Sequence, residues 1–131
     1  MTARWPDEPA AFMAAYVEAW NEGDLERVVD AYQPVAPVYQ GGQILAHDAA
    51  TRRTFLSDYL DSTRDELAAG TRWECPSLDV ANLGANGVLA TARWVFRRPD
   101  GSALEDYLDS YVLVRINGRW AIFADVIHDA S

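Results

Sequence analysis

Two aspartates near the end of the chain, Asp109 and Asp125, have the clearest potential for acid–base chemistry. Each lies in a segment where apolar and polar residues alternate, which is typical of a β-strand, and we expect both side chains to be buried. Two neighbouring carboxyl groups do not both ionise at low cost, so the pKa of one should rise while the other stays ionised. Such a pair can transfer protons on a carbonyl compound or open an epoxide.

The distance between these acids depends on the turn at Asn117-Gly118. The Asn-Gly pair favours a hairpin, because both positions accept a positive φ. If the turn carries a one-residue bulge, the facing pairs are Asp109 with Asp125 and Tyr111 with Phe123. If the turn is the simpler two-residue form, Ser110 faces Asp125 and Asp109 points to the other side of the sheet. We prefer the bulged register because it gathers four side chains on one face: Tyr107, Asp109, Tyr111 and Asp125.

A second turn, at Pro99-Asp100-Gly101, sets the neighbours of the first acid. It is expected to lay Arg93 beside Tyr107 and Thr91 beside Asp109. Arg93 would then act as the charge partner of the acids by favouring their ionised forms. The alternative is that Arg93 and the acids form a buried ion network with no turnover, since structural networks also shift pKa values.

Aromatic residues complete the predicted site. Tyr16 and Tyr39 are candidate hydroxyl donors, although buried tyrosines are more often core residues whose hydroxyls find a partner. Trp20, Trp73 and Trp94 are expected to line an apolar cavity around the acids. The predicted ligand-contacting residues are Trp20, Trp73, Thr91, Tyr107, Tyr111 and Phe123.

Three helices and a run of strands are predicted to position these residues. The first helix begins at Pro9 and carries an apolar stripe, and Asp24 and Asp48 are expected to cap the next two. A short hairpin is predicted about Gly41-Gly42, and from Trp73 onward the chain reads as strand, with a bulge at a proline. Helices followed by an antiparallel sheet indicate one α+β domain over residues 1–131, with residues 1–7 as a loose arm.

Composition narrows the possible partners. The 131 residues carry a net charge of −9 and contain no lysine. Affinity for phosphates needs clustered basic residues, so we expect neither nucleic acid nor an anionic membrane as a partner. The single cysteine, Cys75, and the lack of a long apolar segment favour the reducing cytoplasm. No metal-ligand spacing and no glycine-rich phosphate loop stand out, so no cofactor is expected.

Three segments together resemble the nuclear-transport-factor-2-like superfamily, in particular its SnoaL-like branch. They are AYVEAWNEGDLERVVDAY, APVY after the second helix, and NGRWAIFADVIHD at the end. The resemblance implies a cone in which three N-terminal helices pack on a curved, mainly antiparallel sheet, with a ligand cavity at the open end. It also implies a homodimer formed through the outer face of the sheet, which would explain why both faces of the last two strands are apolar.

The superfamily includes isomerases, hydrolases, cyclases and proteins that only bind, so each residue set is compared separately. Tyr16 matches the tyrosine of ketosteroid isomerases, but Gln40 stands in place of their aspartate base. Tyr39 and Asp125 match residues of limonene epoxide hydrolases, but Gly41 stands where those enzymes have an asparagine. Polyketide cyclases use an aspartate that corresponds to Asp125 or Asp109.

The resemblance thus implies a protein that binds a small apolar or cyclic molecule, with cofactor-independent isomerase, cyclase or hydrolase chemistry. In that interpretation Asp125 is the base and Asp109 the acid. A non-catalytic ligand-binding module and a dimeric assembly domain are the alternatives.

Overall fold

Six strands form one sheet in the computed structural model, which describes residues 5–129. The strand order is β2-β1-β6-β5-β4-β3. The β1 and β6 strands are parallel and every other neighbouring pair is antiparallel. The bounds are β1 Val38–Gln40, β2 Gln43–Ala46, β3 Arg72–Asn82, β4 Gly87–Arg97, β5 Ala103–Ile116 and β6 Arg119–Ile127. The predicted α+β fold is confirmed, including the register break in β3 between Glu74 and Ser77, around the proline.

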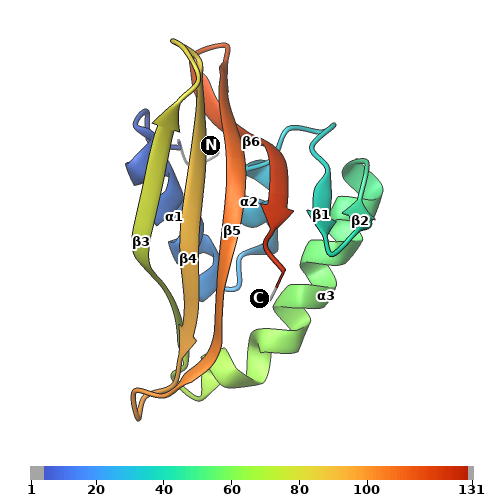
Figure 1. Cartoon of the computed structure of the whole chain (residues 1–131). Coiled ribbons are helices and arrows are strands. Elements are labelled where there is room, and N and C mark those ends of the chain that lie inside the picture. The colour runs from blue at the N-terminus through green and yellow to red at the C-terminus, as the bar shows by residue number, and fades with distance from the viewer. Residues whose placement is uncertain (1–4, 130–131) are drawn as a thin grey trace.

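Three helices lie on one side of this sheet, as Figure 1 shows. They are α1 Pro9–Asn21, α2 Leu25–Asp30 and α3 Ala49–Ala68. The Asp24 carboxylate accepts a hydrogen bond from the backbone N–H of Arg27, and Asp48 forms a capping box with Thr51, so both predicted caps are present. Among residues 5–129, no helix combines the length and apolar character needed to cross a bilayer.

The start of the chain differs from the loose arm predicted over residues 1–7. Residues 1–4 lie outside the described part of the structure, but Trp5 is only 8% exposed. Its ring lies 4.9 Å from that of Phe12, and its Nε1 donates to Asp30 at 3.0 Å. Trp120 donates to the carbonyl oxygen of Asp7. Residues 5–7 therefore pack against the domain, because burying a tryptophan removes a large apolar surface from water.

The β5–β6 hairpin has the simpler two-residue register next to the turn and departs from both registers considered from the sequence near the acids. Asn117 and Gly118, with φ of 54° and 74°, form a simple two-residue turn between the paired residues Ile116 and Arg119. A bulge lies further along, where Phe123 has no partner, so Tyr111 faces Asp125. Relative to the preferred register the shift is two residues. A two-residue shift keeps every side chain on the same face, so the acids still share one side of the sheet.

The β4–β5 hairpin also differs from the prediction, with the opposite consequence. Thr91 pairs with Ser110 and Arg93 pairs with Leu108, whereas the sequence placed them beside Asp109 and Tyr107. An irregularity next to Arg97 shifts the register by one residue. A one-residue shift moves side chains to the other face, so Arg93 and Thr91 lie on the outer side of the sheet, away from the acids.

Candidate functional site

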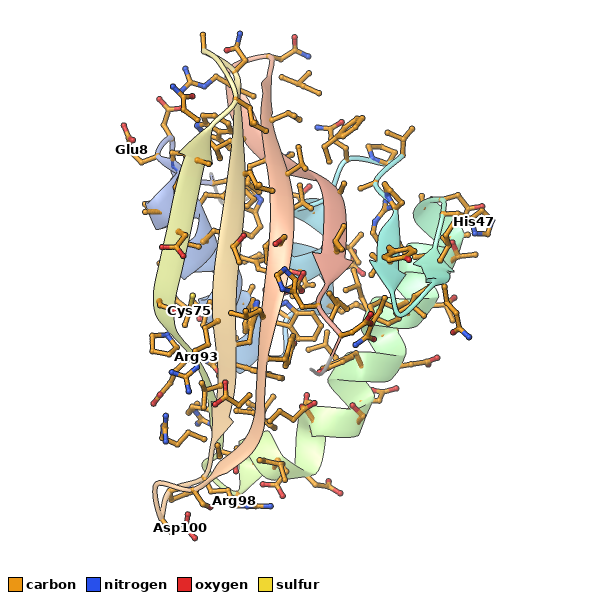
Figure 2. The ribbon with its side chains drawn as sticks, viewed as in Figure 1. Glu8, His47, Cys75, Arg93, Arg98 and Asp100 are labelled. Atoms are coloured by element: carbon orange, nitrogen blue, oxygen red, sulfur yellow. The ribbon has the colours of Figure 1, made fainter. Side chains whose placement is uncertain are left out.

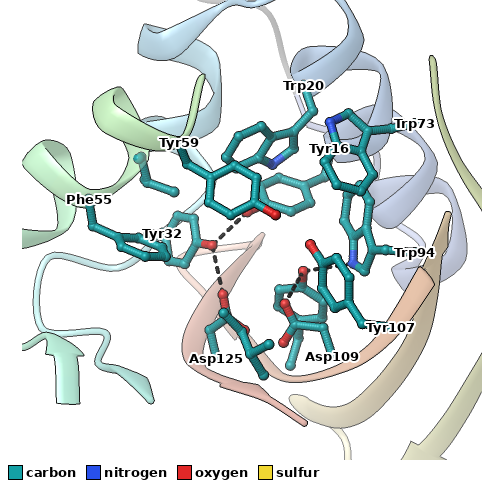
Figure 3. Close-up of a pocket in the computed structure, with 13 residues that line it drawn as sticks. Tyr16, Trp20, Tyr32, Phe55, Tyr59, Trp73, Trp94, Tyr107, Asp109 and Asp125 are labelled. Atoms are coloured by element: carbon teal, nitrogen blue, oxygen red, sulfur yellow. Dashed lines mark hydrogen bonds between the residues drawn. The ribbon is translucent and has the colours of Figure 1, made fainter. Parts of the chain in front are cut away.

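A small cavity lies between the helices and the inner face of the sheet (Figure 3). Its free volume is about 30 Å³, which is the room that one water molecule occupies. Nine of its 13 lining residues are aromatic and two are acidic. The lining residues are Tyr16, Trp20, Tyr32, Phe55, Leu56, Tyr59, Trp73, Trp94, Tyr107, Asp109, Tyr111, Asp125 and Ile127.

Asp109 is 3% exposed and comes from β5. Its Oδ2 accepts a hydrogen bond of 2.8 Å from the Tyr111 hydroxyl, which itself accepts one of 3.0 Å from Trp94 Nε1. Its Oδ1 is buried and has no hydrogen-bond partner in the described part of the chain. Burial raises the pKa of Asp109 well above its ordinary value, and the negative charge of Asp125 raises it further.

Asp125, from β6, is 4% exposed, and its hydrogen-bond partner comes from the helical layer. The hydroxyl of Tyr32 donates to its Oδ2 at 3.0 Å, and the hydroxyls of Tyr32 and Tyr16 are hydrogen-bonded at 2.6 Å. Its Oδ1 is likewise buried without a partner among residues 5–129. Burial raises the pKa of Asp125, while its contacts with Asp109 and Tyr32 lower it. Asp109 is therefore the group that favours the neutral form.

No arginine or histidine of the described chain lines the cavity. Arg52 is a buried basic residue near the cavity, but it does not line it. Its guanidinium lies 5.4 Å from the centre of the Tyr32 ring. Its Nη atoms donate to the carbonyl oxygens of Ala36 and Pro34. Two buried carboxyls without a cation cannot both ionise at low cost, so burial together favours a state in which the pair holds a proton.

Both carboxyls line the cavity and lie close enough to interact with each other, and the Oδ1 of each accepts no hydrogen bond from the described residues. A protonated carboxyl can donate through that oxygen, and an ionised one can accept. The buried Nε1 of Trp73 is a further donor without a partner in the described chain. The tyrosines remain protonated, since burial raises the pKa of Tyr16, Tyr32 and Tyr111. The site thus presents a donor and an acceptor within an aromatic wall.

The structure brings together seven of the predicted site residues at this cavity: Tyr16, Trp20, Trp73, Tyr107, Asp109, Tyr111 and Asp125. Tyr32, Tyr59 and Phe55 also line it and were not predicted as site residues. In the sequence, Tyr32 follows Leu25, Val28 and Val29 at helical spacing, a pattern that predicts a core residue. Only its position opposite β6, which is set by tertiary packing, brings its hydroxyl to Asp125.

Four predicted site residues lie elsewhere. Arg93 is on the outer face and forms an ion pair of 2.6 Å with Asp106 (Figure 2). The Thr91 hydroxyl is hydrogen-bonded to that of Ser110 on the same outer face. Tyr39, on the short strand β1, is 41% exposed, and Phe123, at the bulge, is 43% exposed. The placement of Thr91, Arg93 and Phe123 in the pocket was wrong because it assumed the registers that the two bulges shift. Tyr39 was placed there by the family resemblance, not by a register.

An open groove of about 960 Å³ adjoins the cavity. Four residues line both: Phe55, Tyr59, Tyr107 and Ile127. The Tyr59 hydroxyl donates to the Glu105 carboxylate, with oxygen–oxygen distances of 3.3 and 3.4 Å. These side chains form the boundary between the cavity and the groove, and a ligand that reaches the acids from the groove must pass them.

A family model described as "NTF2-like protein (DUF6841)" matches residues 7–130. The chain belongs to this NTF2-like family. The superfamily predicted from the sequence is thereby confirmed. No curated protein shows significant similarity to the chain.

Several solved structures share the NTF2-like architecture. A putative calcium/calmodulin-dependent protein kinase type II association domain from Thiobacillus denitrificans has a TM-score of 0.78 at 13% identity, covering 99% of this chain and 100% of that one. An NTF2-like protein with a cystatin-like fold from Novosphingobium aromaticivorans has a TM-score of 0.71 at 18% identity, covering 91% and 79%. An NTF2-like protein of unknown function from Shewanella oneidensis has a TM-score of 0.69 at 18% identity, covering 89% and 93%. At such identities the likeness shows the fold.

Proposed function

We propose that this NTF2-like protein acts in the cytoplasm, binds a small apolar or cyclic molecule in its aromatic cavity and transfers protons on it without a cofactor. The observation that carries the proposal is the pair of buried carboxyls, each with one free oxygen at the cavity and no basic residue among the lining side chains. Perturbed carboxyls in an aromatic pocket are typical of acid–base sites.

The two acids would have different roles. Asp109, the more readily protonated, donates to an oxygen of the ligand, while ionised Asp125 removes a proton from a neighbouring carbon. The Tyr32 hydroxyl stabilises the carboxylate of Asp125 and receives a hydrogen bond from Tyr16. Trp73, whose buried Nε1 has no partner in the described chain, lines the same cavity.

The second candidate is binding without turnover, and the cavity volume favours it. Room for one water admits a single polar group of a ligand, whereas its ring must displace Tyr59 or Tyr107 or remain in the groove. A site of this size can hold a functional group firmly and still never bring a carbon atom within reach of the base.

Deuterium exchange separates these functions. Cyclohexanone in D₂O is followed by NMR for the loss of its α-proton signals, and its binding is followed by the fluorescence of the tryptophans that line the cavity. We expect exchange in the wild type, and loss of exchange with retained binding in Asp109→Asn and Asp125→Asn. The exposed Asp61→Asn serves as a charge-matched control on α3. Binding without exchange in the wild type would support the binding module, and no binding would refute both.

We also propose that the protein forms a homodimer through the outer face of its sheet. Exposed apolar side chains gather there on neighbouring strands, among them Leu108, Phe123 and Val126. Covering such residues is a common use of an apolar sheet face. Light scattering during size-exclusion chromatography should give twice the mass of the chain. A monomer at micromolar concentration would contradict the proposal.

A further inference from the structure

Acidic side chains outnumber basic ones at the cavity and at its entrance. Inside, two acids face nine aromatic residues with no basic side chain among the lining residues of the described chain. Outside, the groove is lined by Arg93 and Asp106, which form an ion pair, and by Glu105, Asp129 and His128. The ion pair cancels its own charges, so the carboxylates of Glu105 and Asp129 give the groove its negative charge. The whole chain has a net charge of −9. This arrangement attracts cations along the path to the buried acids and repels anions.

Aromatic walls beside carboxylates suit an ammonium group. The faces of tryptophan and tyrosine rings attract cations, and the attraction is greatest where water is excluded. An ammonium group has three N–H donors and no acceptor, which complements two free carboxyl oxygens. The unpartnered Oδ1 atoms of Asp109 and Asp125 are such acceptors, and each belongs to a residue that is less than 5% exposed.

The volume of the cavity selects among ammonium groups. A free volume of about 30 Å³ matches a primary ammonium head, which is close to a water molecule in size. A quaternary ammonium, with its methyl groups, is several times larger. The hydrophobic body of the molecule would lie toward the groove, beside Phe55, Tyr59 and Ile127, which line both spaces.

We propose that the preferred ligand of this site is a primary organic amine, whose ammonium group sits between Asp109 and Asp125 while its apolar body extends past Tyr59 and Tyr107 toward the groove. The inference rests on the ligand pocket of the proposed function and concerns binding alone, because with an ammonium group bound both acids are ionised and Asp109 has no proton to donate. It states which chemical class the pocket selects.

The two acids give this binding a characteristic signature. Without a cation, the pair holds one proton because the carboxyls are buried together. An ammonium ion supplies the missing positive charge and stabilises both carboxylates, so the proton leaves as the amine enters. Affinity should therefore rise with pH up to the range where the amine itself loses its charge. A neutral ligand that accepts a hydrogen bond from the protonated acid should show the reverse dependence.

Five molecules that share a cyclohexane ring and carry a positive, neutral or negative group test the proposal: cyclohexylamine, trimethylcyclohexylammonium, cyclohexanol, cyclohexanone and cyclohexanecarboxylate. Calorimetric titrations of the wild type, in two buffers with different ionisation enthalpies, give both affinity and proton release. We expect cyclohexylamine to bind at least about tenfold more tightly than cyclohexanol, since hydrogen bonds to charged groups are the stronger ones. Its binding should release protons, and trimethylcyclohexylammonium should bind more weakly than cyclohexylamine.

Two variants locate the effect. Asp109→Asn/Asp125→Asn should remove the preference for the amine and its proton release, whereas Asp61→Asn should retain both; thermal denaturation verifies that each variant is folded. If cyclohexanol or cyclohexanone binds the wild type as tightly as the amine, the donor at Trp73 decides selectivity, and the amine proposal is wrong while the pocket stands. Tighter binding of the carboxylate, or of the quaternary ammonium, would likewise overturn it. If no molecule of the series binds, both the amine and the ligand pocket are refuted.

Discussion

Replacing Asp109 by asparagine should change how stability depends on pH. Asparagine keeps the size of the side chain and an acceptor for the Tyr111 hydroxyl, but it holds no titrating proton. In the folded protein, burial and then the charge of Asp125 raise the pKa of Asp109 well above its ordinary value. In the unfolded chain the pKa is ordinary. Between these two values, the folded wild type holds a proton that the unfolded chain has released.

The sign and the slope follow from this difference. A carboxyl whose pKa is raised by folding contributes its full stabilisation when the pH is below its pKa in the unfolded chain. That contribution is lost as the pH rises through its pKa in the folded protein. Linkage sets the loss at about 1.4 kcal/mol of unfolding free energy per pH unit for each proton. Asp125 adds to it with the same sign, since burial raises its pKa too. Asp48 and Asp100, whose pKa values are lowered by hydrogen bonds from Thr51 and Ser102, act with the opposite sign at more acidic pH.

Urea denaturation followed by tryptophan fluorescence between about pH 5 and pH 8 measures this effect, because carboxyls with ordinary pKa values are already ionised in that range. The difference in unfolding free energy between Asp109→Asn and the wild type should grow with pH, with a slope of up to about 1.4 kcal/mol per pH unit. The variant should be the more stable protein at the upper end. Asp61→Asn should follow the wild-type curve. Parallel curves for Asp109→Asn and the wild type would show that Asp109 titrates normally, and the reasoning on the acid pair would fail.

Two further predictions concern single contacts. Tyr32→Phe removes the hydroxyl that donates to Asp125, so it should raise the pKa of Asp125 further. Urea denaturation should show an unfolding free energy lower by about 1–3 kcal/mol. An unchanged free energy would mean that this hydrogen bond does not stabilise the fold. Gly70→Ala should lower the melting temperature more than Gly23→Ala does, because both residues have positive φ but an added Cβ at Gly70 would lie 3.1 Å from Pro99 Cγ. Equal decreases in melting temperature would show that the positive φ accounts for the destabilisation and that the contact with Pro99 adds nothing.

The elements of the fold were predictable because their signals are local. Asp24 and Asp48 cap their helices through bonds to backbone groups three residues away, and such a pattern can be read from the sequence. The three C-terminal turns carry glycine at positive φ, including Gly101 and Gly118. Helix starts, turn positions and the break in β3 therefore agree with the prediction.

The site was predictable only in part, because pairing across a sheet depends on bulges. The bulge at Phe123 lies within β6, and the irregularity next to Arg97 lies at the end of β4, beside the turn. Neither was predicted from the local sequence. A register error of two residues left Asp109 on the correct face, whereas an error of one residue moved Arg93 to the wrong one. The alternation of apolar and polar residues therefore predicts which face of the sheet a side chain occupies only where the strand register is known.

The position of Arg93 also decides between two interpretations of the acids. A buried ion network without turnover requires a cation beside the carboxyls, and Arg93 was the residue expected to supply it. Arg93 lies on the outer face with Asp106 as its partner, and no basic residue of the described chain lines the cavity. Burying two carboxyls without a cation costs stability, and hydrogen bonds from Tyr32 and Tyr111 and the interaction between the two carboxyls offset part of that cost. A group from outside the chain that pairs with the Oδ1 atoms would offset more of it, which supports the ligand pocket proposed above.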